Sequence, residues 1–338
     1  MMLPVRNHHD RLFGHVFSQP EHAEGELRLL LPAEVSAKLD WSTLRVERTH
    51  IIDAKLAERR TDVLFSVRLD GRERELYLYL LLEHQSSPDH WMALRLLGAL
   101  LRIWEDYLSK NAGAKKLPAI VPMVVTHADG GWSSPLTFRE LLDLDEATFD
   151  ELGAHLPDFT FLLDDLSSAR AEDLHGRSMT TLGRLTLFCL KRARSSGDFL
   201  AELARWRDSL EDVLAAPNGV AALGAVLRYV LEASDVQPEE VRDLTKGLGP
   251  KGEEAFMTGA QILRAEGEAR GRAEGKAEGK AEGKAEGKAE VLLRLLQLKF
   301  GVVPEPVAAR VHSASLADLD RWVERVITAT TLESVLAD

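Results

Sequence analysis

The part of the sequence that most limits how this chain can fold is an apolar run within residues 75–85, ELYLYLLLEHQ. A membrane span needs about 18 or more consecutive apolar residues, and neither this run nor any other window reaches that length. The run is also too apolar for a strand at the exposed edge of a sheet. We therefore expect a central buried strand that ends where Glu83 and Gln85 return polar groups to the chain.

A second β-rich segment precedes this strand at residues 61–69, TDVLFSVRL. Asp70-Gly71 follows it, and this pair favours a tight turn because both residues tolerate positive φ. In a hairpin that turns there, opposite residues have numbers that sum to about 143 to 145. Asp62 is therefore expected opposite residues 81–83, at the open end of an antiparallel pair.

Two carboxylates, those of Asp62 and Glu83, are expected to meet at this open end although they are 21 positions apart. An unpaired charge at the end of a buried strand is costly, and a divalent cation can offset the cost. Two carboxylates and a main-chain carbonyl are hard oxygen ligands of the kind that Mg²⁺ prefers. A water acidified by that ion can attack a phosphodiester. Gln85 lies two positions beyond Glu83 and so shares its face of the strand.

Hydrophobic periodicity predicts further elements on both sides of this hairpin. They are helices within 10–39, broken at Pro20 and Pro32, a strand at 43–52, a helix at 89–108 and a strand at 118–126. The buried face of the helix at 89–108 is expected to consist of Leu94, Leu97, Leu101 and Trp104. The resulting order is helix, strand, strand, strand, helix, strand.

This order, with Asp62 and a Glu-x-Gln array, resembles the PD-(D/E)xK nuclease superfamily. More narrowly, LLLEHQSSPD, then a helix with MALRLL, then IVPMVV, is similar to the recombination-promoting nuclease and putative transposase family. His9-Asp10-Arg11-Leu12-Phe13 and Arg60-Thr61-Asp62 fit the same family. The resemblance implies an α/β restriction-endonuclease-like core (α-β-β-β-α-β, with a mixed central sheet) and a metal-dependent DNA endonuclease linked to recombination.

The resemblance also implies roles for individual residues. Asp62 and Glu83 would be ligands of Mg²⁺ or Mn²⁺, together with the main-chain carbonyl of His84. Gln85 stands where the superfamily usually has lysine, so it could position a water but could not neutralise charge. Asp10 would be an outer-sphere partner of the metal. The candidate contacts to DNA phosphates are Arg60, Arg95 and Arg102.

Each of these residues also has a purely structural interpretation. Asp62 could pair with a neighbouring arginine, and Glu83 could be an ordinary solvated residue at a strand end. Gln85 could likewise be structural, and Arg95 on a leucine-rich helix could be salt-bridged or snorkelling. Histidines His8, His9, His15, His84 and His90 lack an HExxH pattern and are expected at the surface or with satisfied hydrogen bonds.

The charge distribution weighs against tight DNA binding by this chain alone. It carries 54 acidic and 42 basic residues, a net charge of −12, whereas proteins that grip a nucleic-acid backbone usually have an excess of Lys and Arg. Residues 131–264 hold most of the imbalance, with 23 acidic and 14 basic residues. Residues 1–130 are almost neutral. This pattern favours a competing class, a catalytically weak or inactive nuclease-fold interaction protein.

Four regions are expected along the chain. The resemblance covers roughly residues 8–165, so we predict a nuclease-like domain at 1–165 and a mainly helical region at 166–264. Residues 265–290 are of low complexity, with four copies of AEGK. For residues 291–338 we predict a small helical domain, similar to a C-terminal domain of unknown function that accompanies this family.

The AEGK repeat predicts a helix that is marginal by itself. Each glycine costs about 0.5–1 kcal/mol relative to alanine, and like charges face each other at i,i+4. Its Gly and Ala stripes would let another helix approach closely. The segment is either a self-associating stalk, giving a homo-oligomer through 265–338, or an extendable spacer.

The single cysteine, Cys189, excludes an intrachain disulfide and a multi-cysteine zinc site. The N-terminal sequence shows no apolar core followed by a cleavage site, so no signal peptide is expected. A cytoplasmic, reducing location without a membrane is the resulting expectation. A DDE-type transposase triad is not expected, because no third acidic residue follows the fourth strand at a suitable place.

Overall fold

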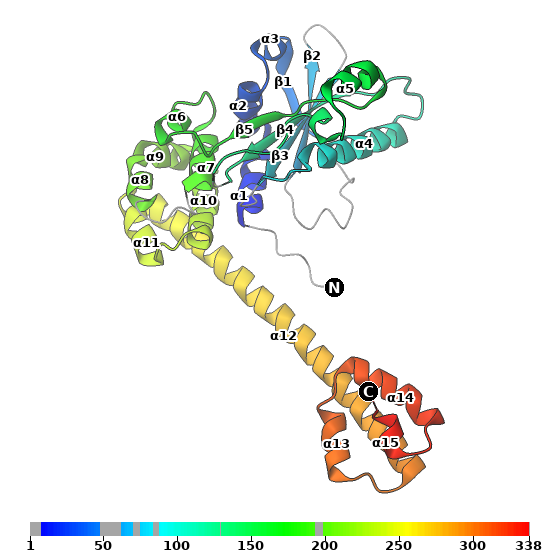
Figure 1. Ribbon diagram of the computed structural model, residues 1–338. Helices are drawn as coiled ribbons and strands as arrows, with labels where there is room; N and C mark the ends of the chain where they lie inside the picture. Colours follow the sequence, from blue (N-terminus) through cyan, green and yellow to red (C-terminus); the bar gives the residue numbers. More distant parts are fainter. Residues whose placement is uncertain are drawn as a thin grey trace. The chain divides into compact units, whose positions relative to one another are not determined.

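A computed structural model describes most of the chain (Figure 1). The described residues are 8–47, 62–69, 75–83, 88–128, 130–192 and 199–337, with the backbone alone for 82–83, 270, 273–274 and 277–278. No described helix is both long and apolar enough to cross a lipid bilayer.

The centre of the N-terminal part is a five-stranded mixed sheet in the order β1-β2-β3-β4-β5. Its strands are β1 (Leu39–Val46), β2 (Asp62–Leu69), β3 (Glu75–Glu83), β4 (Ala119–Thr126) and β5 (Leu162–Asp165). β1 to β3 pair antiparallel, while β3, β4 and β5 run parallel. The predicted α/β core with a mixed sheet is therefore confirmed, with the apolar run as its middle strand. The predicted strand at 43–52 begins earlier, and the sequence analysis did not predict β5.

The predicted hairpin register is also confirmed. Asp62 lies opposite Leu81, and Arg68 lies opposite Glu75. Because β3 also pairs with β4, Glu83 lies beside Thr126 at the last position of both strands.

One face of the sheet is covered by α4 (Met92–Lys110). The predicted buried face of this helix is wrong at Leu94 and Leu101, which are about half exposed, whereas Leu97 packs against the buried cluster. The buried positions are Met92, Ala93, Leu96, Leu100 and Ile103, and all of them except Leu100 belong to one cluster with Leu64, Tyr79 and Leu81. Leucines occupy two stripes of α4, and only contact with the sheet determines which stripe is buried. Trp104, half-buried, donates its indole N–H to the carbonyl of Pro118 at 2.9 Å.

The other face of the sheet packs against helices from both ends of the first 261 residues. They are α1 (His8–Phe17), α2 (Pro20–Leu30), α7 (Thr181–Arg192) and α10 (Gly219–Ala233). Phe13 and Phe17 from α1 are fully buried in the same cluster as Phe65 from β2 and Phe188 from α7. Residues before and after position 165 thus share one core, and residues 1–261 form one compact unit.

A buried ion cluster fastens β5 to this core. The guanidinium of Arg177 donates to Asp164 on β5 at 2.6 and 2.8 Å and to Glu26 on α2 at 3.0 Å. Glu26 is completely buried. Its burial and the neighbouring carboxylate of Asp164 raise the pKa of Glu26 well above its usual value, against the opposing effect of Arg177.

Shorter elements complete this unit. They are α3 (Ala33–Ser36), η1 (Arg139–Leu141), α5 (Glu146–Leu152), η2 (Gly153–His155), α6 (Ala171–His175), α8 (Phe199–Arg205), α9 (Arg207–Ala215) and α11 (Pro238–Lys246).

The second unit, residues 262–338, is helical as predicted. It contains most of α12 (Pro250–Phe300), then α13 (Glu305–His312), α14 (Leu316–Thr328) and α15 (Leu332–Val335). Its core joins Leu292 and Leu296 of α12 to Trp322 and Val326 of α14. The AEGK repeats lie inside α12, and no described atom outside that helix's own backbone approaches the glycines at 275, 279, 283 and 287.

Candidate active site

The candidate site lies at one edge of the sheet, where the parallel strands end and β2 begins. Asp62 opens β2, Glu83 closes β3, Thr126 closes β4 and Asp165 closes β5. The register aligns Glu83 with Thr126, and Thr126 with Asp165. The two carboxylates predicted from the hairpin therefore belong to the same edge.

The carboxylate of Asp62 is half-buried and held by a neighbour on β3. The hydroxyl of Tyr79 donates to Oδ2 of Asp62 at 2.5 Å. Tyr79 lies two positions before Leu81, the residue opposite Asp62, so the contact runs diagonally across the antiparallel pair. Asp62 is thereby placed on the face of the sheet that α4 covers.

Several predicted residues fall outside the described side chains. The backbone of Glu83 is described but its side chain is not, and His84, Gln85 and Arg60 lie outside the described residues. The roles of these four residues stay predictions.

A cluster of histidines lies beside the same edge. His127 follows β4 directly, and its ring centroid lies 4.7 Å from that of His9 in α1. His9 has its Nδ1 2.8 Å from the hydroxyl of Tyr229 in α10, and its Nε2 3.0 Å from Nε2 of His8. Only 2% of His9 and 6% of His127 are exposed. The first turn of α1 is therefore anchored at the end of β4.

Asp10 belongs to this anchored turn and is buried. Arg11, the next residue, pairs with Glu232 of α10 at 2.5 Å. Two side chains of α10, Tyr229 and Glu232, thus hold the turn that carries Asp10. Helix α10 belongs to the region that the sequence analysis assigned to a separate helical part.

Sequence reasoning missed His127 and Tyr229. His127 could have been found, because it follows a buried strand in the same way that Glu83 closes one. Tyr229 is 220 positions from His9, and nothing in the local pattern of α10 distinguishes it from a core residue.

The two described arginines of the predicted DNA contacts both lie on α4. Arg95 is in the first turns of the helix, and its guanidinium pairs with Asp89. The other carboxylate oxygen of Asp89 accepts from the main-chain N–H of Trp91 at 2.8 Å. Arg102 is half-exposed, about two turns further along the helix.

The donor set fits a hard divalent cation in its chemistry. Among the described side chains, which do not include that of Glu83, no three His, Cys, Asp or Glu residues are grouped closely enough to hold a metal ion. The backbone places two carboxylate residues at one edge, and Mg²⁺ typically takes one or two carboxylates and keeps several waters. Asp62 and Glu83 are the residues that would hold such an ion.

Comparisons with known proteins agree with the predicted resemblance. The sequence profile of the family described as "Putative transposase, YhgA-like" matches residues 7–220. Recombination-promoting nuclease RpnA of Escherichia coli (strain K12) is 30% identical over 262 residues, which make up 77% of this chain and 84% of that protein. Recombination-promoting nuclease RpnC of the same strain is 34% identical over 124 residues, 37% of this chain and 40% of that protein.

A relative of similar coverage carries a different name. Inactive recombination-promoting nuclease-like protein RpnE of Escherichia coli (strain K12) is 28% identical over 264 residues, 77% of this chain and 82% of that protein. No solved structure matches the chain.

Proposed function

Because the chain belongs to the family described as putative transposase, YhgA-like, we propose that it is a metal-dependent endonuclease. It would hydrolyse the phosphodiester bonds of DNA in recombination. A relative that covers most of its length is named a recombination-promoting nuclease. One observation carries the proposal: the strand register brings Asp62 and Glu83 to the same edge of the sheet. In open α/β sheets, ligands bind outside the carboxyl ends of the strands, which is this edge.

Asp62 and Glu83 would hold Mg²⁺ or Mn²⁺, with the carbonyl of His84 as a third ligand. When bound, the ion supplies Lewis-acid chemistry that activates water and offsets negative charge on the phosphate. Tyr79 fixes the carboxylate of Asp62 through its 2.5 Å hydrogen bond. Gln85 would orient the attacking water through its amide dipole, in the place of the superfamily's lysine.

In the proposed enzyme, the α/β core has the restriction-endonuclease-like fold, and arginines around the site bind DNA. Asp10, in the anchored turn of α1, would act in the outer sphere of the metal. Arg60, Arg95 and Arg102 would contact phosphates. Arg95 pairs with Asp89, so it would have to exchange that carboxylate for a phosphate oxygen when DNA binds.

Plasmid cleavage tests the proposal. The full chain is incubated with supercoiled plasmid and Mg²⁺ or Mn²⁺, beside Asp62→Asn and Glu83→Gln. Glu21→Gln is the matched control, because it removes a carboxylate that is exposed on α2. We expect cleavage by the wild type and the control, and loss of at least about a hundredfold in rate in the two site variants, as is usual when charge stabilisation of a transition state is removed. Cleavage that persists in both site variants would refute the assignment.

A second function is favoured by one observation, the name of the relative RpnE as inactive at comparable coverage. In that case the chain is a nuclease-fold interaction protein that acts through its helical and C-terminal regions. Absence of cleavage with either metal on supercoiled, linear and single-stranded DNA would favour this function.

A further inference from the structure

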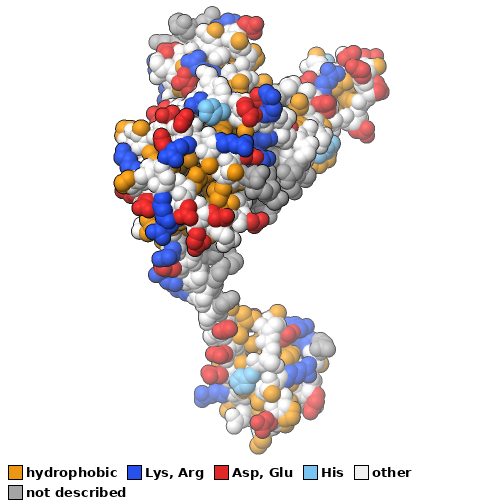
Figure 2. Space-filling model, turned by 90° about the vertical axis from the view of Figure 1, so that its left-hand side faces the viewer, with side chains coloured by type: hydrophobic (Ala, Val, Ile, Leu, Met, Phe, Trp, Pro, Cys, Tyr) orange, Lys and Arg blue, Asp and Glu red, His pale blue; other side chains and the backbone are white. Residues whose placement is uncertain are grey.

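A cavity of about 510 Å³ lies in the helical part of the first unit, where α6, the end of α7 and α8 meet. It shares no lining residue with the candidate active site. Its polar lining includes Arg170, His175, Lys191, Arg192, Glu202 and Arg205. The face of the molecule turned toward the viewer in Figure 2 is the side on which these helices lie, and Lys and Arg side chains are interspersed there with Asp and Glu around apolar patches.

The cavity is a positively charged site in an acidic region. Four cationic side chains line it, against the carboxylates of Glu172 and Glu202. The surrounding residues 131–264 carry 23 acidic and 14 basic side chains. The local excess of cations is therefore opposite in sign to that of the region around it.

Two of the four cations are already engaged by carboxylates. Arg192 binds Glu202 with two hydrogen bonds, and Arg170 binds Asp173 in the same manner, at 3.0 and 3.1 Å. These pairs fix the side chains that frame the cavity.

The other two cations have no carboxylate partner among the residues that the structure describes. The ammonium of Lys191 donates to the main-chain carbonyls of Leu166 and Ser167, each at 2.6 Å. Burial and the nearby Arg192 lower the pKa of Lys191, against the opposing effect of the carboxylate of Asp165. Arg205 also lines the cavity, is exposed, and has no hydrogen-bonded partner in the described part of the chain.

We propose that this cavity binds a small phosphate monoester. A phosphate dianion has two negative charges, opposite to those of Lys191 and Arg205, the two cations without a carboxylate partner. The guanidinium can donate directional hydrogen bonds to the phosphate oxygens, and the ammonium adds a compact positive charge. The volume falls within the roughly 300–1,000 Å³ of small-molecule sites, enough for a group as large as a mononucleotide. The site is independent of the proposed cleavage, because it involves none of the residues assigned to that reaction.

Isothermal titration calorimetry on the full chain tests the proposal, with three probes at constant ionic strength: inorganic phosphate, thymidine 5′-monophosphate and thymidine. We expect saturable binding of the two phosphate compounds and none of thymidine. Tighter binding of thymidine 5′-monophosphate than of inorganic phosphate would support the monoester, and equal or weaker binding would overturn it in favour of a site for free phosphate. Absence of saturable binding by both phosphate compounds in the millimolar range would overturn the proposal.

Two variants test whether phosphate binds in this cavity. Arg205→Gln removes an exposed cation without a described partner, so it should leave the fold intact and weaken phosphate binding roughly tenfold or more, as expected for a lost charge-assisted hydrogen bond. Arg242→Gln is the matched control, an exposed arginine of α11 outside the cavity. Equal affinity in Arg205→Gln and wild type, with both chains folded by circular dichroism, would contradict the assignment.

Discussion

The hydroxyl of Tyr79 donates a hydrogen bond of 2.5 Å to Oδ2 of Asp62, diagonally across the β2–β3 pair. Tyr79 lies in the middle strand of the sheet and is buried against α4. The buried strand β3 therefore sets the orientation of the candidate metal ligand Asp62. A substitution of Tyr79 should alter the position of that carboxylate without removing a ligand.

We expect Tyr79→Phe to lower the rate of metal-dependent plasmid cleavage while retaining the fold. Loss of the hydrogen bond should reduce the free energy of unfolding by about 1 kcal/mol, measured by urea denaturation. Tyr107→Phe is the control, since Tyr107 on α4 contacts the ring of Tyr77 and not Asp62. Unchanged cleavage by Tyr79→Phe would show that Asp62 does not depend on this bond.

A second prediction concerns α10, which contributes Tyr229 from beyond the residues that match the family profile. Tyr229→Phe removes the hydroxyl that lies 2.8 Å from Nδ1 of His9. We expect slower cleavage, because the turn of α1 that carries Asp10 loses an anchor, and a loss of stability of about 1 kcal/mol. Cleavage at the wild-type rate in a destabilised Tyr229→Phe protein would assign Tyr229 to stability alone.

The sheet was largely predictable from the sequence because its signals are local. The length and apolarity of residues 75–85, the Asp70-Gly71 pair and the spacing to Asp62 predicted the hairpin and its register, and Asp62 indeed lies opposite Leu81. The side of α4 that is buried was not predictable, because leucines at 94 and 101 repeat as regularly as those at 96 and 100.

Contacts between distant segments were not predicted, because no local sequence signal marks them. Strand β5 has only four residues, LLDD, and two of them are acidic, so no apolar alternation marks it. The contact between His9 and Tyr229 depends on how α10 folds back onto α1, which no local pattern encodes. At the site, the placement of Asp62 and Glu83 at one edge of the sheet could be predicted, whereas the contact between His9 and Tyr229 could not.

The buried cluster of Glu26, Asp164 and Arg177 should make stability depend on pH. The folded chain holds a proton on Glu26 that the unfolded chain releases above the usual carboxyl pKa, because burial and Asp164 raise the folded pKa. The stabilisation that this proton gives to the folded chain is complete below the usual carboxyl pKa. It is lost as the pH rises through the raised pKa of Glu26 in the folded chain. Glu26→Gln mimics the protonated form, so the free energy of unfolding should fall less steeply with rising pH than in the wild type.

Urea denaturation across a series of pH values measures this effect. Glu24→Gln, two positions away on α2 and paired with Arg28 at the surface, is the control and should keep the wild-type pH dependence. Parallel curves for Glu26→Gln and wild type would contradict the raised pKa. Arg177→Met should be far more harmful, by about 3–5 kcal/mol, because it leaves the largely buried carboxylate of Asp164 and the carboxyl group of Glu26 without their cationic partner.

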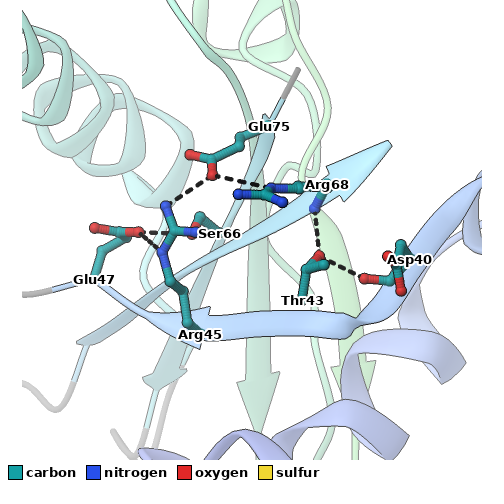
Figure 3. A network of polar contacts seen from close by, with 7 residues as sticks. All are labelled: Asp40, Thr43, Arg45, Glu47, Ser66, Arg68 and Glu75. Atoms are coloured by element: carbon teal, nitrogen blue, oxygen red, sulfur yellow. Dashed lines mark hydrogen bonds and ion pairs between the residues drawn. The ribbon is translucent and has the colours of Figure 1, made fainter. Parts of the chain in front are cut away.

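A polar network joins the ends of β1, β2 and β3 (Figure 3). Its charges predict a raised pKa for Tyr77, which lies on β3. Arg45 binds Glu47 at 3.0 Å and Glu75 at 2.8 Å, and Ser66 donates to Glu47 at 2.6 Å. Burial, together with the charges of these two glutamates, raises the pKa of Tyr77 to about 12. Absorbance titration should show a late phenol transition that disappears in Tyr77→Phe and moves to lower pH in Glu75→Gln. A late transition that persists in Tyr77→Phe would belong to another tyrosine.

Two glycines of the same helix, α12, should respond to alanine in opposite ways. A Cβ at Gly259 would lie 2.7 Å from the carbonyl oxygen of Gly224 and 3.2 Å from the N of Arg228, both backbone atoms of α10. Gly259→Ala should therefore separate α10 from α12 and lower the thermal midpoint. At Gly283, in the AEGK repeat, a Cβ meets no atom within 4 Å. Gly283→Ala should stabilise the helix by about 0.5–1 kcal/mol, seen as a gain in helical circular dichroism. A loss of stability in Gly283→Ala would instead indicate that a second helix packs against the glycine stripe, as a self-associating stalk requires.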